Sequence, residues 1–137
     1  MDSQFLAPVD KLATDIPGFD LVTLGGLPRG RTTLVAGTAG SAKTVFAAQF
    51  LAEGILRSQE AGVFVTFEEP PDDLRRNMAS FGWPIAEWER QGLWRFVDGS
   101  IQAHDDDHVV GQYDLGGLLV RIEHAVTSIN ARRVSLD

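Results

Sequence analysis

Short apolar runs alternate along the chain with segments of helical periodicity. The run at residues 62–69 is the clearest strand, because it is rich in valine and phenylalanine and two prolines stop it. Similar runs predict buried strands at residues 31–37, 93–99 and 132–137. A helical pattern separates each predicted strand from the next one.

Three such segments have the pattern of helices. Residues 43–56 are apolar on most sides and predict a helix buried under a sheet. Residues 71–83 open with a proline and two aspartates, a typical helix start. Asp114 is placed to cap a third helix, whose apolar residues follow helical spacing at Leu115, Leu118, Leu119, Ile122, Val126 and Ile129. Strands and helices that alternate in this way predict an α/β fold with a mostly parallel sheet flanked by helices.

Composition and charge restrict the classes of protein to which the chain can belong. Its 137 residues favour a single domain, and 44% hydrophobic with 23% charged residues is ordinary for a soluble globular protein. The sequence has no cysteine, which excludes disulfides and thiolate metal sites and favours a cytoplasmic location. The N-terminus does not have the pattern of a signal peptide, and no apolar run has the length of a membrane span. The net charge of −7 argues against general binding to nucleic acids or anionic membranes.

Residues 37–44 read GTAGSAKT, one residue away from the phosphate-binding pattern G-x-x-x-x-G-K-[ST]. Gly37, Lys43 and Thr44 are in register with that pattern, between a predicted strand and a predicted helix. Backbone N–H groups around residues 40–43 would then face phosphate oxygens at a helix N-terminus. Lys43 would reach the β- and γ-phosphates, and the Thr44 hydroxyl would bind Mg²⁺. We therefore interpret the segment as a nucleotide-binding loop, against the alternative of a glycine-rich turn with an incidental lysine.

Ala42 stands where this pattern has its second glycine. If the position requires a positive φ angle, alanine costs about 1–2 kcal/mol. If φ is helical, alanine is harmless unless its methyl group touches a phosphate. The sequence leaves both alternatives open, and in either case we expect weakened or tolerated binding rather than a loop that cannot bind.

Three carboxylates follow predicted strands. Glu68 and Glu69 lie where the run at residues 62–69 ends, and ligands in α/β sheets gather at the carboxyl ends of strands. A glutamate there could orient the water that attacks the γ-phosphate or act as a general base, and the alternative is a solvated strand exit. Asp137 follows the last apolar run, which is the arrangement of a Walker B aspartate that positions Mg²⁺ through water.

Two further groups of residues invite a functional interpretation. Residues 104–108 read HDDDH, and histidine and carboxylate side chains are ligands for zinc or manganese. Acidic loops are usually solvated, so we favour a solvated loop there. Trp83, Trp88 and Trp94 are expected to pack in the core rather than to stack on nucleic-acid bases.

Long stretches of the sequence resemble the N-terminal ATPase domain of the KaiC family of circadian clock proteins. These stretches are residues 18–55 and 62–83, followed by YDLGGLL and RRVSLD towards the end of the chain. The resemblance extends from about Lys11 to Asp137. It implies a RecA-like P-loop ATPase core that assembles into a homo-oligomeric ring, a hexamer in this family, with ATP between neighbouring subunits. Other clock proteins of the Kai type are the partners that it implies.

The resemblance also implies roles for individual residues. Glu68 and Glu69 correspond to a pair of catalytic glutamates, and Asp137 corresponds to the Walker B residue that holds Mg²⁺ together with Thr44. ATP and Mg²⁺ are thus the expected ligands. The expected nucleotide-binding residues are Gly37, Gly40, Ser41, Ala42, Lys43, Thr44, Val45 and Ser80.

Domains of this family continue beyond the Walker B strand, with further sheet strands and with basic residues that reach a neighbour's nucleotide. The sequence therefore predicts a core that is incomplete at its C-terminus, a chain that self-associates, and slow ATP hydrolysis. The family's phosphorylation sites belong to a second domain, so no autokinase activity is expected. Two alternatives are a catalytically silent interaction piece of a KaiC-like protein and a DNA-acting recombinase or helicase relative, and the net charge of −7 weighs against the latter.

Overall fold

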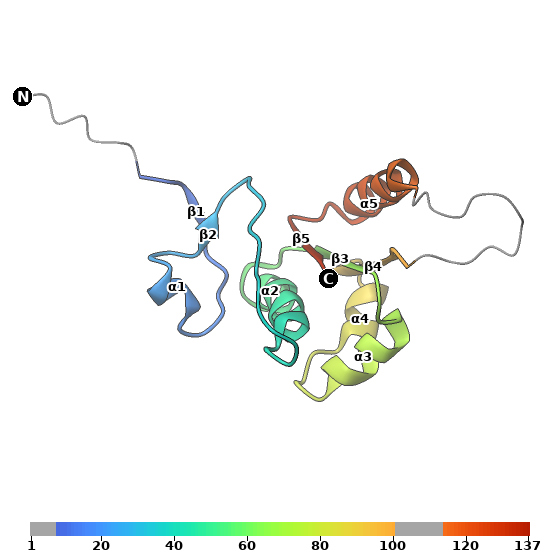
Figure 1. Cartoon of the computed structure of the whole chain (residues 1–137), viewed down its shortest axis with the longest axis horizontal. Coiled ribbons are helices and arrows are strands. Elements are labelled where there is room, and N and C mark those ends of the chain that lie inside the picture. The colour runs from blue at the N-terminus through green and yellow to red at the C-terminus, as the bar shows by residue number, and fades with distance from the viewer. Residues whose placement is uncertain (1–7, 101–113) are drawn as a thin grey trace, which may run out of the picture.

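A three-stranded parallel sheet forms the centre of the computed structural model, which describes residues 8–100 and 114–137 (Figure 1). The strand order is β4–β3–β5, with β3 (Gly62–Thr66) between β4 (Trp94–Asp98) and β5 (Arg133–Leu136). Both pairs of strands are parallel, and every residue of β3 is buried. The three later strands predicted from the sequence, and their parallel direction, are confirmed.

Helices cover both faces of this sheet (Figure 1). The helices α2 (Lys43–Ser58), α3 (Pro71–Ala79) and α4 (Ile85–Arg90) share a core with Phe64 of β3. Because side chains alternate along a strand, the neighbours of Phe64 on β3 face the other way and pack against α5 (Leu115–Ile129). This layering confirms the predicted α/β core, in which helices flank a parallel sheet. No helix in the described part of the chain is long and apolar enough to cross a membrane.

The core on the α2 side is aromatic. Trp83, Trp88 and Trp94 are 8%, 5% and 2% exposed, which confirms that they are core residues. Trp94 stacks on Phe64 with ring centroids 6.0 Å apart and on Trp88 with centroids 6.2 Å apart. The sequence did not predict α4, which carries Trp88, because a helix of six residues is too short to show a periodic pattern.

The start of α5 confirms the predicted cap. The Asp114 carboxylate accepts a hydrogen bond from the Gly117 amide at 2.9 Å, which satisfies one of the free N–H groups of the first turn. Leu118 is buried against the sheet, whereas Leu115 and Leu119 are 59% and 57% exposed. The apolar face predicted for this helix is therefore wider than the face that the sheet covers.

An N-terminal unit of residues 8–30 precedes the phosphate-loop sequence. In it, β1 (Lys11–Leu12) pairs antiparallel with β2 (Leu27–Pro28), and α1 (Phe19–Val22) lies between them in the chain. Gly26 closes this unit with φ at 111°, and a Cβ atom there would lie 2.0 Å from the Leu12 carbonyl oxygen. None of these elements was predicted, because two-residue strands and a single helical turn have no detectable periodicity.

The strand predicted at residues 31–37 is wrong. The segment has no regular secondary structure, and Leu34 and Val35 are 89% and 46% exposed. A strand is stable only when a neighbour accepts and donates its backbone hydrogen bonds, and no strand in the described residues is paired with this segment. Its sequence has the composition of a buried strand, but in the described structure it has no pairing strand and its apolar side chains are exposed.

A buried arginine joins the N-terminal unit to the sheet. Arg133 of β5 is fully buried, and its guanidinium donates to the carbonyls of Ala13, Thr14 and Phe50 at 2.9, 3.1 and 3.0 Å. It also pairs with the Glu60 carboxylate at 3.2 Å. Since Phe50 belongs to α2, one side chain of β5 holds both the N-terminal unit and the helix that follows the phosphate loop.

Candidate nucleotide site at the phosphate loop

The backbone of residues 37–42 turns sharply before α2 begins at Lys43. Gly40 has φ at +79°, and Ala42 has φ at 63° with ψ at 29°, so both lie in the left-handed region. A Cβ atom at Gly37 would lie 2.5 Å from the Ser41 hydroxyl oxygen, so a side chain there would displace Ser41. The glycines of the motif are therefore explained by this turn.

Ala42 is the residue where the structure decides between the alternatives that the sequence left open. Its left-handed conformation costs an L-residue about 1–2 kcal/mol, whereas glycine adopts it without strain. Ala42 is also the N-cap of α2, and its side chain cannot accept a hydrogen bond from the first turn. The first amides of α2 are consequently without a side-chain cap.

Lys43 lies back over the loop. Its Nζ donates to the carbonyl oxygens of Gly37 and Thr38 at 2.8 and 2.9 Å, and the Ser41 hydroxyl lies at 3.5 Å. All three contacts are exposed to solvent. Thr44 and Val45 follow in the first turn of α2 and are half-buried. The lysine charge thus lies at the centre of the loop, where an anion can compete for it.

The paired glutamates follow β3 and have different surroundings. The Glu69 carboxylate accepts a hydrogen bond at 2.7 Å from the side-chain amide of Asn77 in α3. Its backbone carbonyl accepts one at 2.6 Å from the Thr66 hydroxyl, which shapes the turn after the strand. Glu68 is exposed and has no hydrogen-bond or ion-pair partner among the described residues. Glu68 is therefore the freer of the two carboxylates.

Asp137 lies at the same edge of the sheet as the glutamates. Its amide donates to the Val65 carbonyl and its own carbonyl accepts from the Phe67 amide, both at 2.9 Å. These bonds extend the ladder of β3 and β5, so Asp137 is opposite the residues that immediately precede Glu68. The structure thus places Asp137 and the paired glutamates at one carboxyl edge of the sheet, the edge at which α/β proteins bind ligands.

Ser80 is connected to this edge through Asn77. Ser80 follows α3, and its hydroxyl donates to the Asn77 carbonyl at 2.7 Å. The same asparagine holds the Glu69 carboxylate through its side chain. Sequence reasoning missed Asn77, although a polar amide on the first helix after the glutamates was a signal that could have identified it.

The loop and the carboxyl edge are joined through α2 rather than by a hydrogen bond or ion pair of their own. No hydrogen bond or ion pair among the described residues links residues 37–44 to Glu68, Glu69 or Asp137. Instead, the Ser135 hydroxyl on β5 donates at 2.9 Å to the Ala47 carbonyl in α2. Helix α2 therefore begins at the loop and is hydrogen-bonded to β5, the strand that ends at the carboxyl edge.

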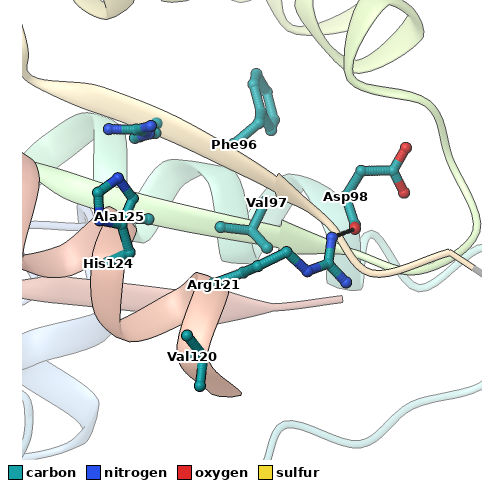
Figure 2. A pocket seen from close by; sticks show the side chains of 8 residues that line it. Phe96, Val97, Asp98, Val120, Arg121, His124 and Ala125 are labelled. Atoms are coloured by element: carbon teal, nitrogen blue, oxygen red, sulfur yellow. Dashed lines mark hydrogen bonds between the residues drawn. The ribbon is translucent and has the colours of Figure 1, made fainter. Parts of the chain in front are cut away.

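Two other features lie outside this site. The HDDDH segment lies outside the residues that the structure describes, and those residues contain no group of three or more potential metal ligands. A pocket of about 370 Å³ lies between β4 and α5, on the opposite side of the sheet from α2 (Figure 2). The sequence analysis did not identify its residues.

A parallel sheet with helices on both faces, and a phosphate-loop sequence leading into α2, are features of α/β proteins of the P-loop class. The model of the ATPase family KaiC matches residues 12–137 of this chain. The chain therefore belongs to the KaiC ATPase family.

Relatives with known names support the same assignment. The circadian clock protein KaiC3 of a Synechocystis species is 63% identical over 129 residues, which is 94% of this chain and 25% of the relative. The circadian clock oscillator proteins KaiC of Prochlorococcus marinus and Thermostichus vulcanus are each 48% identical, over 94% and 98% of this chain and 26% of their own lengths. The chain thus spans about a quarter of the length of the curated relatives that it matches.

Proposed function

We propose that this chain binds ATP with Mg²⁺ and hydrolyses it slowly, as the ATPase module of a KaiC-like clock protein. The observation that carries the proposal is the position of Lys43, which begins α2 directly after a turn with two left-handed residues. Such a turn offers backbone amides and the positive end of a helix to phosphate oxygens. The family to which the chain belongs supports nucleotide as the ligand.

The loop residues would bind the phosphates. The hydrogen bonds of Lys43 to the Gly37 and Thr38 carbonyls are exposed, so the ammonium can exchange one of them for a charged phosphate oxygen. The residues that we assign to the nucleotide are those from Gly37 to Val45 that the sequence indicated, together with Ser80.

Magnesium would bind at the carboxyl edge. A hydroxyl at Thr44 and a carboxylate at Asp137 are the hard oxygen donors that Mg²⁺ prefers, and the Asp137 side chain is exposed for this role. When bound, the ion neutralises charge on the phosphates. Glu68 would accept the proton of the attacking water, because its carboxylate is exposed and has no partner among the described residues. The Asn77 amide would hold Glu69 in a fixed orientation.

Titration with a fluorescent ATP analogue, with and without Mg²⁺, tests binding. Lys43→Ala is expected to weaken binding about tenfold or more, because a charge-assisted hydrogen bond is lost. Arg132→Ala is the matched control, since Arg132 is exposed and lies outside the loop, and it should bind like the wild type. An unchanged dissociation constant for Lys43→Ala would overturn the nucleotide site.

A catalytically silent interaction module is the second candidate. It is favoured by Ala42, whose strained conformation opposes tight binding, and by Lys43, whose donors already have partners in the loop. Phosphate release under steady-state conditions separates the two functions. Turnover that disappears when Glu68→Gln and Glu69→Gln are combined supports the ATPase, whereas binding without such turnover supports the silent module.

The family also suggests the oligomeric state, the partners and the cellular location of the chain. Its relatives are named circadian clock proteins, and we propose a homo-oligomer that works with other clock proteins of the Kai type in the cytoplasm. The cysteine-free sequence agrees with a reducing compartment, and the net charge of −7 argues against nucleic acid as a partner.

A further inference from the structure

Glu68, the carboxylate proposed to activate water, is held only by the backbone on either side of it. Its side chain is exposed and has no hydrogen-bond or ion-pair partner among the described residues. Before it, the Phe67 amide donates to the Asp137 carbonyl at 2.9 Å. After it, the Glu69 backbone carbonyl accepts a hydrogen bond from the Thr66 hydroxyl at 2.6 Å. These two bonds therefore determine where the Glu68 carboxylate lies.

Thr66 is the more rigid of the anchors. It is the last residue of β3 and is 1% exposed, so water does not compete for its hydroxyl. Its own carbonyl accepts from the Gly99 amide at 2.7 Å, which fixes the backbone that carries the side chain. A β-branched side chain has few rotamers, and a buried hydroxyl without an acceptor is costly. Both effects favour the turn in which Thr66 is bonded to Glu69.

A second contact on Glu69 is weaker. The Asn77 amide donates to the Glu69 carboxylate at 2.7 Å, but this bond is exposed to solvent, whereas the bond from Thr66 is partly buried. Water competes with an exposed hydrogen bond and lowers its net contribution. Thr66 is therefore the principal constraint on the turn after β3.

We propose that Thr66 is a positioning residue for ATP hydrolysis, which it serves by fixing the turn that carries Glu68. This inference rests on the proposed function, in which Glu68 takes a proton from the water whose oxygen bonds to the γ-phosphorus as ADP leaves. Because Thr66 is buried, it acts through the backbone and not on the nucleotide. A base that is displaced by a fraction of its hydrogen-bond distance loses much of its effect.

Steady-state phosphate release tests the catalytic part. Thr66→Val keeps the branched shape but removes the hydroxyl, and should lower kcat about tenfold while KM changes less than about twofold. Thr66→Ser keeps the hydroxyl and should retain most of the wild-type kcat. Thr14→Val is the matched control, because Thr14 is also buried and donates to the Asp20 carboxylate at 2.6 Å. It should lower the melting temperature without changing kcat.

Limited proteolysis tests the turn itself without nucleotide. A protease specific for glutamate requires a locally open chain, so it reports how often the turn opens. Cleavage between Glu68 and Glu69 should be about threefold or more faster in Thr66→Val than in the wild type, and unchanged in Thr66→Ser. Glu123, exposed on α5, is the internal reference, and cleavage after it should be equal in all variants.

The outcomes separate this inference from the proposed function. Equal cleavage after Glu68 in wild type and Thr66→Val would overturn it, as would a kcat in Thr66→Ser that is as low as in Thr66→Val. A rise in KM at constant kcat would likewise contradict a role in positioning the base. Wild-type turnover that persists in Glu68→Gln would instead refute the proposed role of Glu68, and the cleavage rates would still decide whether Thr66 fixes the turn.

Discussion

At the scale of a single residue, Ala42 introduces backbone strain into the phosphate loop. Its φ of 63° lies in the region that glycine adopts freely and alanine does not. Ala42 immediately precedes Lys43, so the strained residue is one of those whose backbone amides are proposed to face the phosphates. Removing the strain should favour the conformation that binds.

Ala42→Gly is accordingly expected to raise nucleotide affinity by up to about fivefold, because the strain of about 1–2 kcal/mol is partly offset by the extra freedom of glycine when the loop is open. Titration with the fluorescent analogue measures the change. Ala39→Gly is the matched control, since Ala39 does not have a positive φ and should gain nothing. A marked loss of affinity in Ala42→Gly would show that the loop binds in a different conformation.

Asp20 stabilises the N-terminal unit through hydrogen bonds to its carboxylate. Oδ1 accepts from the Thr14 amide at 3.0 Å and from the Thr14 hydroxyl at 2.6 Å, and Oδ2 accepts from the Asp15 amide at 2.9 Å. Desolvation raises the pKa of Asp20, but these hydrogen bonds and the charge of Arg133 outweigh it, so the pKa is lowered. A lowered pKa means that the ionised carboxylate contributes stability above the unfolded-state pKa and loses it as the pH falls through the folded-state value.

Asp20→Asn should therefore lower the melting temperature at pH 7, where the wild-type carboxylate is fully ionised. The difference between wild type and variant should shrink as the pH falls from about 5 to about 3, since the wild type then loses the same contribution. Asp10→Asn is the control, because Asp10 is 79% exposed and pairs with Arg29 on the surface. A difference between wild type and Asp20→Asn that does not change with pH would contradict this role.

At the scale of elements, α2 and β5 are fastened by side chains of the strand. Arg133 and Ser135 donate to the carbonyls of Phe50 and Ala47, which lie nearly one turn apart on the helix. Gly54 permits this contact, because a Cβ atom there would lie 2.6 Å from Arg133 Nε. The fit of strand to helix thus depends on a glycine in the interior of α2.

Gly54→Ala is expected to destabilise the protein by about 1–3 kcal/mol, although alanine has the higher helix propensity, because the methyl group would displace the buried guanidinium. Gly116→Ala is the matched substitution in α5. A Cβ atom there meets the Asp114 carboxylate at an ordinary 3.5 Å, so this variant should be neutral or slightly stabilised. Urea denaturation compares the two, and equal effects of both substitutions would contradict the steric explanation.

At the scale of the whole molecule, apolar side chains remain exposed along the edge of the sheet and beside it. β5 pairs with β3 on one side, and Leu136 is 57% exposed. Leu34, in the segment where a strand was predicted, is 89% exposed. Unpaired strand edges with apolar side chains favour association with another chain.

We therefore expect this 137-residue chain to self-associate at micromolar concentration, with the β5 edge as the interface. Sedimentation velocity over a range of concentrations measures this association. Leu136→Lys should shift the chain towards monomer, whereas Leu119→Lys, at an equally exposed residue on α5, should not. A monomeric wild type would refute the expectation, and a dominant effect of Leu119→Lys would place the interface on the helix.

The elements that could be predicted are those whose signals lie within their own residues. The cap at Asp114, the apolar run of β3 and the periodicity of α2 are local patterns, and each produced the expected element. The phosphate-loop motif and the family were likewise contained in the order of the residues. α4 was missed because its six residues carry too short a pattern, although its tryptophan was correctly expected in the core.

The sequence by itself determined the α/β class, the family and the residues of the candidate site, because motifs and periodicity are properties of the chain alone. The tertiary structure decided the conformation of Ala42, the burial of Arg133 and the failure of residues 31–37 to form a strand. It also brought Asn77 to Glu69 and formed the pocket between β4 and α5. These features depend on contacts between residues distant in the chain, and such contacts exist only after the sheet and its helices have packed together.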